Sequence, residues 1–372
     1  MKKMYILLGL SSLIFFSFTN DSFLDETADE TDSYPQYIGP QASSKSYSKR
    51  EDGYEDLMDP TSMSYLTFTY LLWQAKSDGL ELAQRTTPSL AVPSTRYDKS
   101  LEDMKYSYES GFKVGTGYKF DYDKWDLYFQ YLHHRVKNSK SVSYRSNGTL
   151  NLLYVDTATY HSISGKDSWK CKLHLFNLDL KKPFLLGQKV IFEPFFGLKG
   201  GWLTQKLNRK DLVEHVTSLV RGEYKGSYKS DTGFVGPEIG VNTNWFFYKN
   251  CSFYANVVGS VAYQEFKISS EMPNLLGDPS INMRSRFTKD RFTPNLDLAV
   301  GLEGKTGYID KKFILKFLLG YEFLVFFDQI KFTTTENILH PYTGIADQAY
   351  RNILETTNVT LHGLTASLEI DW

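Results

Sequence analysis

Apolar and polar residues alternate with a period of two along most of this chain. The clearest stretch runs from Phe313 to Val325, where every second residue is large and apolar and the residues between include Lys316, Gly320 and Glu322. Successive side chains of a β-strand point to opposite faces, so this pattern predicts a strand with one apolar and one more polar face. Ten such stretches follow one another between about residue 64 and Trp372, which predicts an all-β protein.

The connections between these stretches alternate strictly between short and long. Short ones fall at about 121–124, 181–187, 247–251 and 305–311. Long ones fall at about 76–104, 138–167, 207–231, 268–291 and 329–357. A transmembrane antiparallel β-barrel has an even number of strands, short periplasmic turns and long extracellular loops, whereas a soluble β-sandwich has no reason to alternate its loop lengths. We therefore expect a barrel of about ten strands, or of twelve if residues 149–163 add a hairpin.

Composition agrees with a barrel rather than with membrane helices. Aromatic residues make up 16% of the 372 residues, yet the mean hydropathy is only −0.36. Barrel strands need an apolar residue only at every second position, which accounts for both values. Beyond the N-terminus no run of about 18 apolar residues, the length of a spanning helix, occurs in the sequence.

The N-terminus predicts export. Lys2 and Lys3 precede an apolar run from Met4 to Phe18, so residues 1–20 are expected to be a signal peptide, with a membrane anchor as the alternative. Residues 21–62 carry 11 acidic and 3 basic side chains and no periodicity, which predicts a flexible, acidic periplasmic lead-in. The barrel is expected over residues 63–372.

Segments of the chain resemble a known family. They are TFTYLLWQAKSDGLELA at 67–83, GFKVGTGYKFDYDKWDLYFQYLHHR at 111–135, WKCKLHLFNLDL at 169–180, EPFFGLKGGWLTQK at 193–206 and GVNTNWFF at 240–247. These segments are similar to those of the pore-forming outer-membrane proteins of the Legionella and chlamydia-like major outer membrane protein type. The resemblance implies an outer-membrane β-barrel classed as a porin, without a catalytic motif.

Two features predict contacts with the membrane and its machinery. The last strand has an apolar face of Leu364, Leu368, Ile370 and Trp372 and ends on an aromatic residue. This resembles the C-terminal signal through which outer-membrane barrels engage the barrel-assembly machinery, although the terminal residue there is usually Phe. Aromatic residues beside the short connections are expected to contact lipid at the periplasmic interface. These interface aromatics are Phe120, Trp125 and Trp245.

The sequence contains no motif that favours an enzyme or a cofactor. Two cysteines exclude a disulfide framework and a cysteine-rich zinc site, and no nucleic-acid-binding surface is indicated. His161 with Ser162 and Ser164 superficially resembles the His/Ser pair of a hydrolase, but an ordinary polar loop is the simpler interpretation. At His133-His134 we expect a polar rim rather than a metal site.

The candidate functional residues are the charged side chains that should face the lumen. They are Lys113, Lys119, Asp126, Glu193, Lys199, Glu238, Asp297, Glu303, Lys316, Glu322, Glu369 and Asp371. An acidic lumen predicts a conduit for small hydrophilic solutes or ions that prefers cations. The alternative is that the charges pair and close the lumen, because ten strands lie near the size that side chains can fill. A structural or adhesive surface barrel is the second functional hypothesis, and the pattern leaves the oligomeric state undefined.

Overall fold

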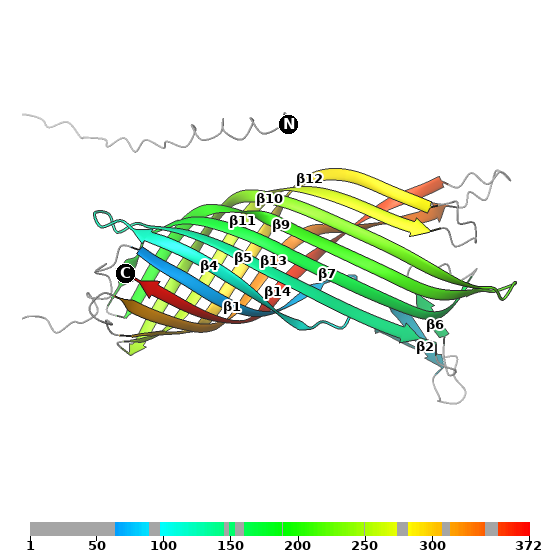
Figure 1. Ribbon diagram of the computed structural model, residues 1–372, viewed down its shortest axis with the longest axis horizontal. Coiled ribbons are helices and arrows are strands. Elements are labelled where there is room, and N and C mark those ends of the chain that lie inside the picture. Colours follow the sequence, from blue (N-terminus) through cyan, green and yellow to red (C-terminus); the bar gives the residue numbers. More distant parts are fainter. Residues whose placement is uncertain are drawn as a thin grey trace, which may run out of the picture. The chain divides into compact units, whose positions relative to one another are not determined.

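The structure is a computed structural model (Figure 1). It describes residues 64–88, 97–144, 149–152, 160–187, 189–248, 250–273, 282–306, 313–338 and 349–372. The predicted signal peptide and the acidic lead-in lie outside the described residues. Among the described residues, no helix is long and apolar enough to cross a membrane.

Ten long antiparallel strands form a closed ring, as predicted. In ring order they are β1 (Ser64–Ser77), β4 (Tyr108–Lys119), β5 (Asp126–Ser143), β7 (Tyr160–Lys181), β9 (Val190–His215), β10 (Arg221–Tyr248), β11 (Cys251–Pro273), β12 (Asn282–Lys305), β13 (Ile314–Ile338) and β14 (Ala349–Asp371). The first and last strands close the ring, with Tyr65 opposite Asp371. A short strand, β8 (Phe184–Leu186), adds to β9 beside the turn.

The residues that allowed a twelve-stranded alternative do not add a hairpin to the ring. Residues 149–152 form β6 (Thr149–Leu152), which pairs with β2 (Ala83–Pro88) in a separate three-stranded sheet completed by β3 (Tyr97–Glu102). Residues 160–163 instead begin β7. The small sheet thus comes from two of the predicted long connections, one after β1 and one after β5.

Apolar side chains face outward and polar ones face the interior at the end of the barrel where the short turns lie. On β1, Leu66, Phe68 and Tyr70 are 42%, 52% and 48% exposed, whereas Thr67 and Thr69 are 9% and 5% exposed. This is the phase that the alternation predicts. It inverts the arrangement of a soluble barrel, because the outer wall is solvated by lipid.

The uncharged outer band has the height of a bilayer core. On β10 the outward side chains carry no charge from Trp245 to Val235, and the next outward charge is Asp231. Ten residues of strand extend about 34 Å, which is about 24 Å along the membrane normal at a tilt of about 45°. A band of about 25 Å is typical of outer-membrane barrels.

Most of the long connections turn out to be continuations of the strands. β9 and β10 contain 26 and 28 residues, and only residues 216–220 separate them (Figure 1). About ten residues suffice to cross the membrane, so these hairpins stay paired well beyond it. The physical reason is that a hairpin keeps its backbone hydrogen bonds in water as well as in lipid.

Lys172 and His174 break the apolar alternation of β7, which allows either a bulge or emergence of the strand from the bilayer, and the pairing excludes a bulge there. β7 pairs without interruption from Ser164 to Lys181, and its register shift lies between Ser162 and Ser164. Lys172 and His174 occupy outward positions, and Lys172 is exposed. The strand leaves the apolar band there, so polar residues replace apolar ones on its outer face.

Candidate functional site in the barrel interior

A polar cavity of about 420 Å³ occupies the interior at the short-turn end. Its lining begins beside the short turns with Lys119, Pro183 and Lys305, and reaches inward to Trp73 and Leu324. Every ring strand contributes to this lining, because inward side chains alternate with outward ones on each of them. The cavity is therefore a property of the whole ring rather than of one loop.

Eleven of the twelve charged residues expected in the lumen line this cavity. The twelfth, Lys199, is 1% exposed and contacts Glu238 and Asp297 from the interior side of β9. The structure also brings three charged residues to the interior that sequence reasoning missed: Asp179, Lys181 and Lys305. All three continue the period of two in their strands, which is the signal that could have identified them.

Lysine–carboxylate pairs cover much of the cavity wall. Lys316 forms an ion pair with Glu369 and lies 3.1 Å from Asp371, which Lys119 also approaches to 3.3 Å. Lys113 pairs with Glu322 across the two strands that separate β4 from β13.

Lys199 forms a second centre, 3.6 Å from Glu238 and paired with Asp297. Counting Lys199, nine carboxylates face six lysines, a net of three negative charges when all are ionised.

Neutral donors hold several of the remaining carboxylates. Tyr65 donates to Asp126 at 2.7 Å, and two asparagine amides on β10 donate to Glu193 and Glu303 at 2.8 Å each. Tyr128 stacks on Tyr65 with ring centroids 5.7 Å apart. The wall is thus a hydrogen-bonded network as well as a charged one.

Some carboxylate oxygens around the cavity have no hydrogen-bond partner among the described residues. They are Oδ1 of Asp126, Asp179, Asp297 and Asp371 and both carboxylate oxygens of Glu238. A buried carboxylate oxygen without a partner is costly unless water or a cation satisfies it. The cavity beside these atoms has room for water, so the arrangement requires a hydrated interior at this end.

On the side of the cavity away from the short turns, an apolar layer occupies the barrel interior. Its main residues are Leu71, Trp73, Leu132, Leu203, Leu324 and Phe326, each at most 3% exposed. They come from β1, β5, β9 and β13, and further buried apolar residues on β7, β10, β11 and β14 complete the cluster. Within the described part of the chain, this layer separates the polar cavity from the far end of the barrel.

The segment after β1 covers the apolar layer. Leu80 and Met104 belong to the same buried cluster. The hydroxyl of Tyr106 donates to the carbonyl of Ser77 at 2.9 Å, and the backbone N–H of Ser107 donates to Asn138 Oδ1 at 2.9 Å. These two hydrogen bonds hold the residues just before β4 inside the barrel.

The small sheet packs against the inner wall beyond the apolar layer. Leu82 and Leu152 form a buried cluster with Val142 and Val213 of the ring strands. The backbone N–H of Leu152 donates to Ser162 Oγ at 3.3 Å. A connection of the barrel thus occupies the interior at the long-hairpin end.

A second group of charges lies in the interior beyond the membrane band. Arg209 donates to both carboxylate oxygens of Asp167, at 2.9 and 3.2 Å from Nε, and all three side chains of the group are at most 3% exposed. Asp211, the third member, accepts no hydrogen bond and lies 4.0 Å from the Arg209 guanidinium. Burial raises the pKa of Asp211 from its ordinary 3.8 to about 7; Arg209 opposes this rise and Asp167 adds to it.

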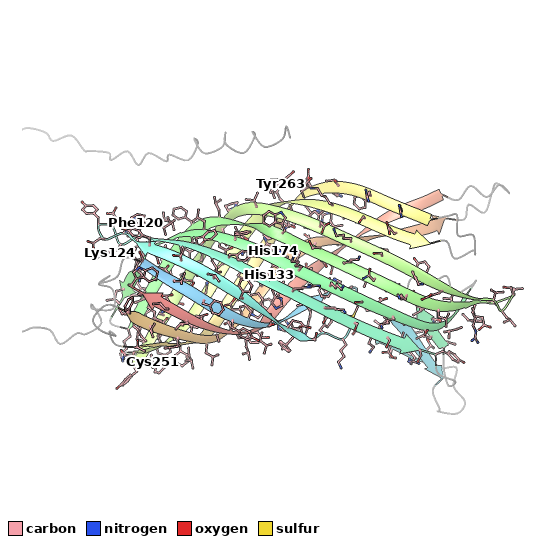
Figure 2. All side chains as sticks on the ribbon, viewed as in Figure 1. Phe120, Lys124, His133, His174, Cys251 and Tyr263 are labelled. Carbon is pink, nitrogen blue, oxygen red and sulfur yellow. The ribbon has the colours of Figure 1, made fainter. Side chains whose placement is uncertain are left out.

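The histidines considered in the sequence lie on both faces of the barrel wall. His161 and Ser162 are neighbours on one strand and point to opposite faces, with His161 exposed and Ser162 buried. His133 faces outward beside His174, with ring centroids 4.6 Å apart, as Figure 2 shows on the outer wall. His134 points inward and stacks near Trp73.

The interface aromatics lie at the short-turn end. Phe120 and Trp245 are 41% and 58% exposed, and Phe120 is at the edge of the barrel in Figure 2. Trp125 is half-buried and meets the ring of Phe196 edge-on at 6.3 Å. They lie beside the short turns, where the sequence predicts contact with the membrane interface.

The C-terminal strand presents its apolar face outward. Leu364 and Trp372 are 52% and 49% exposed, and Leu368 and Ile370 between them are partly exposed. The backbone N–H of Trp372 donates to the carbonyl of Ser64 at 3.0 Å, so the last residue completes the closure of the ring.

The chain is similar to several solved structures and to one protein family. Solved structures with a similar arrangement include the outer membrane protease OmpT from Escherichia coli, at 11% identity and a TM-score of 0.42 over 83% of this chain and 97% of that chain. They also include Ail, the attachment invasion locus protein of Yersinia pestis, at 10% identity and a TM-score of 0.21 over 83% and 98% of the two chains.

The Pseudomonas putida toluene transporter TodX matches at 6% identity and a TM-score of 0.27, over 84% of this chain and 90% of that chain. No curated protein matches the chain in sequence. A family model described as the Legionella pneumophila major outer membrane protein precursor matches residues 60–372, so this protein belongs to the Legionella major outer membrane protein family and resides in the outer membrane.

Proposed function

We propose that the protein is a gated, porin-like channel for small hydrophilic solutes or ions. The observation that carries the proposal is the set of buried carboxylate oxygens around the cavity that accept no hydrogen bond from a described residue; Glu238, whose only close cation is Lys199 at 3.6 Å, contributes two of them. A barrel that served only as an anchor would gain nothing from buried carboxylates, because each costs free energy unless it is hydrated. A water-filled path for solutes would explain the buried carboxylates, because the water in it hydrates them.

The apolar layer is the proposed gate. Trp73, Leu203 and Phe326 are at most 1% exposed, so water does not reach them in this conformation. Hydrophobic constrictions in channels gate by dewetting: they conduct when a side-chain movement lets water fill them. The layer therefore supports a channel with low resting conductance and brief openings, rather than a permanently open pore.

The charge balance of the cavity supports a preference for cations. Nine carboxylates oppose six lysines, and Asp179 and Glu238 lie where the cavity approaches the apolar layer. An excess of negative charge at a narrow point attracts cations, and salt screens that attraction. The proposed role is transport rather than catalysis, and it needs no cofactor.

Planar-bilayer recording of the refolded full-length protein tests the proposal. We expect rare, cation-preferring conductance steps from the wild type. Trp73→Ala, which removes one of the two tryptophans of the apolar layer, should raise the open probability about tenfold or more, and Leu324→Asn should do the same by hydrating the layer. Trp202→Ala is the matched control, because Trp202 is 58% exposed on the outer wall. Folded wild type and gate variants that all stay silent would end the channel proposal.

The length of the hairpins favours a second candidate, a surface barrel that binds other proteins. β9 runs on from Lys206 to His215 beyond the uncharged band, and β10 begins at Arg221 on the same side. Exposed paired strands offer an extended surface to a partner. This candidate is preferred if the bilayer is silent and shortening the β9–β10 hairpin abolishes cell-surface binding without affecting folding.

We also propose that the C-terminal strand is the contact with the barrel-assembly machinery. The supporting observation is that Leu364, Leu368, Ile370 and Trp372 share the outward apolar face of the strand that closes the ring. Trp372→Ser should therefore slow assembly in cells more than it affects refolding of the purified chain. Equal effects in both assays would contradict a role in recognition.

A further inference from the structure

Five basic side chains form a patch on the outer wall of β5, β7 and β9. The basic patch consists of Arg135, Lys137, Lys170, Lys172 and Lys206, all in outward positions. In the register of these strands, Arg135 lies opposite Lys172, and Lys137, Lys170 and Lys206 form one row, which Lys229 of β10 continues. Neighbouring strands are about 4.8 Å apart, and like charges directly opposite each other destabilise a sheet.

No carboxylate of the described chain neutralises the basic patch. None of its five members forms an ion pair with a described residue, and the outward positions of β5 from Leu127 to Ser143 contain no acidic residue.

Several outward cations beyond the uncharged band on other strands do have partners. Lys229 pairs with Asp231 on β10, and Lys267 lies 3.3 Å from Glu265 on β11. Arg284 of β12 lies 3.3 Å from Glu271. The basic patch differs from these pairs because its five cations are neighbours and share no carboxylate, which a partner outside this chain would explain.

The position of the basic patch identifies the level of that partner in the membrane. Directly before it on the same strands lie Tyr131, His133 and His174, with the Tyr131 hydroxyl 2.7 Å from His174 Nδ1. Figure 2 shows the two histidines together on the wall. Aromatic residues with polar edges favour the membrane interface. Lys137 is four residues, or about 13 Å of strand, beyond His133, which corresponds to lipid headgroups.

We propose that the basic patch binds the phosphate groups of a phosphorylated lipid in the outer leaflet of the outer membrane. Arg135 can hold a phosphate through two parallel N–H bonds, and the lysines act as point charges beside it. The acyl chains of the same lipid would lie on the apolar wall below. Repulsion within the patch is relieved when phosphate arrives, which favours binding. This inference depends on the membrane location and not on whether the barrel conducts.

Native mass spectrometry of the folded full-length protein tests the inference. The probes are lipid A with two phosphates and the same lipid after dephosphorylation, each titrated into detergent micelles. The test variant is K137Q/K170Q/K206Q. The matched control is K267Q/R284Q/R286Q, which removes the same number of outward charges from β11 and β12.

We expect the test variant to lose about tenfold or more in affinity for diphosphorylated lipid A and to bind the dephosphorylated lipid like the wild type. The control should change by less than about twofold. Equal losses in both variants, or none in either, would overturn the inference. Binding of phosphatidylglycerol as tight as that of lipid A would overturn the outer-leaflet assignment. If the triple variant fails to fold, Arg135→Gln alone is measured instead and should also lose affinity for diphosphorylated lipid A.

Discussion

Replacing Asp211 by Asn should stabilise the β9–β10 hairpin above neutral pH. Asp211 is 1% exposed, and its two carboxylate oxygens accept no hydrogen bond. It faces Arg209 on its own strand, Asp167 of β7, Tyr224 directly opposite on β10, and Leu152 of the small sheet. Asn has nearly the shape of a protonated Asp and no charge, so the substitution removes the cost of burying the carboxylate.

The magnitude follows from the pKa. Burial raises the pKa of Asp211 from 3.8 to about 7, which corresponds to about 4 kcal/mol against the ionised form. The folded hairpin binds a proton at Asp211 more tightly than the unfolded chain does. The stability that this proton contributes is complete below about pH 4, falls as the pH rises from 4 to 7 and is absent above about 7. Asp211→Asn should therefore gain about 4 kcal/mol at pH 8, about 1.5 kcal/mol at pH 5 and almost nothing below pH 4.

Hydrogen exchange measured by mass spectrometry reports the opening free energy of this hairpin without unfolding the whole barrel. Peptides covering residues 205–228 should show slower exchange in Asp211→Asn at pH 8, after correction for the intrinsic rates, and wild-type rates near pH 4. Asp231→Asn is the control, because Asp231 is a partly exposed member of a surface ion pair and should change stability by less than about 1 kcal/mol. A gain that is independent of pH would refute the reasoning.

The remaining predictions concern the cavity wall and the topology. Lys316→Gln should destabilise the barrel by about 1–3 kcal/mol, because it leaves Glu369 without its cation and Asp371 with Lys119 alone in a partly hydrated site. Lys124→Gln in an exposed turn should cost less than about 1 kcal/mol. Urea unfolding at neutral pH compares the two variants, and equal costs would contradict the role of the interior pairs. On intact cells an impermeant maleimide should react with Lys225→Cys at the long-hairpin end, but should leave native Cys251 unmodified until the outer membrane is permeabilised (Figure 2). Labelling of Cys251 alone would invert the topology.

Much of the barrel follows from local sequence. The period of two assigns each residue to the lipid or the interior, since a strand has no other choice, and this is why the alternation alone places Leu66 outside and Lys316 inside. The alternation of connection lengths and the closure by the last strand likewise specify an even-numbered ring. These features depend on neighbouring residues, which the sequence displays directly.

The state of the interior was decided only by tertiary structure. Leu71, Leu203 and Phe326 are far apart in the chain, and their packing into one layer depends on the register of ten strands. The same applies to Lys199, whose partners Glu238 and Asp297 come from two other strands. Alternation tells which side chains point inward, but not at which height they meet, because height is set by strand pairing around the whole ring. A hydrated cavity below an apolar layer is the result of that pairing.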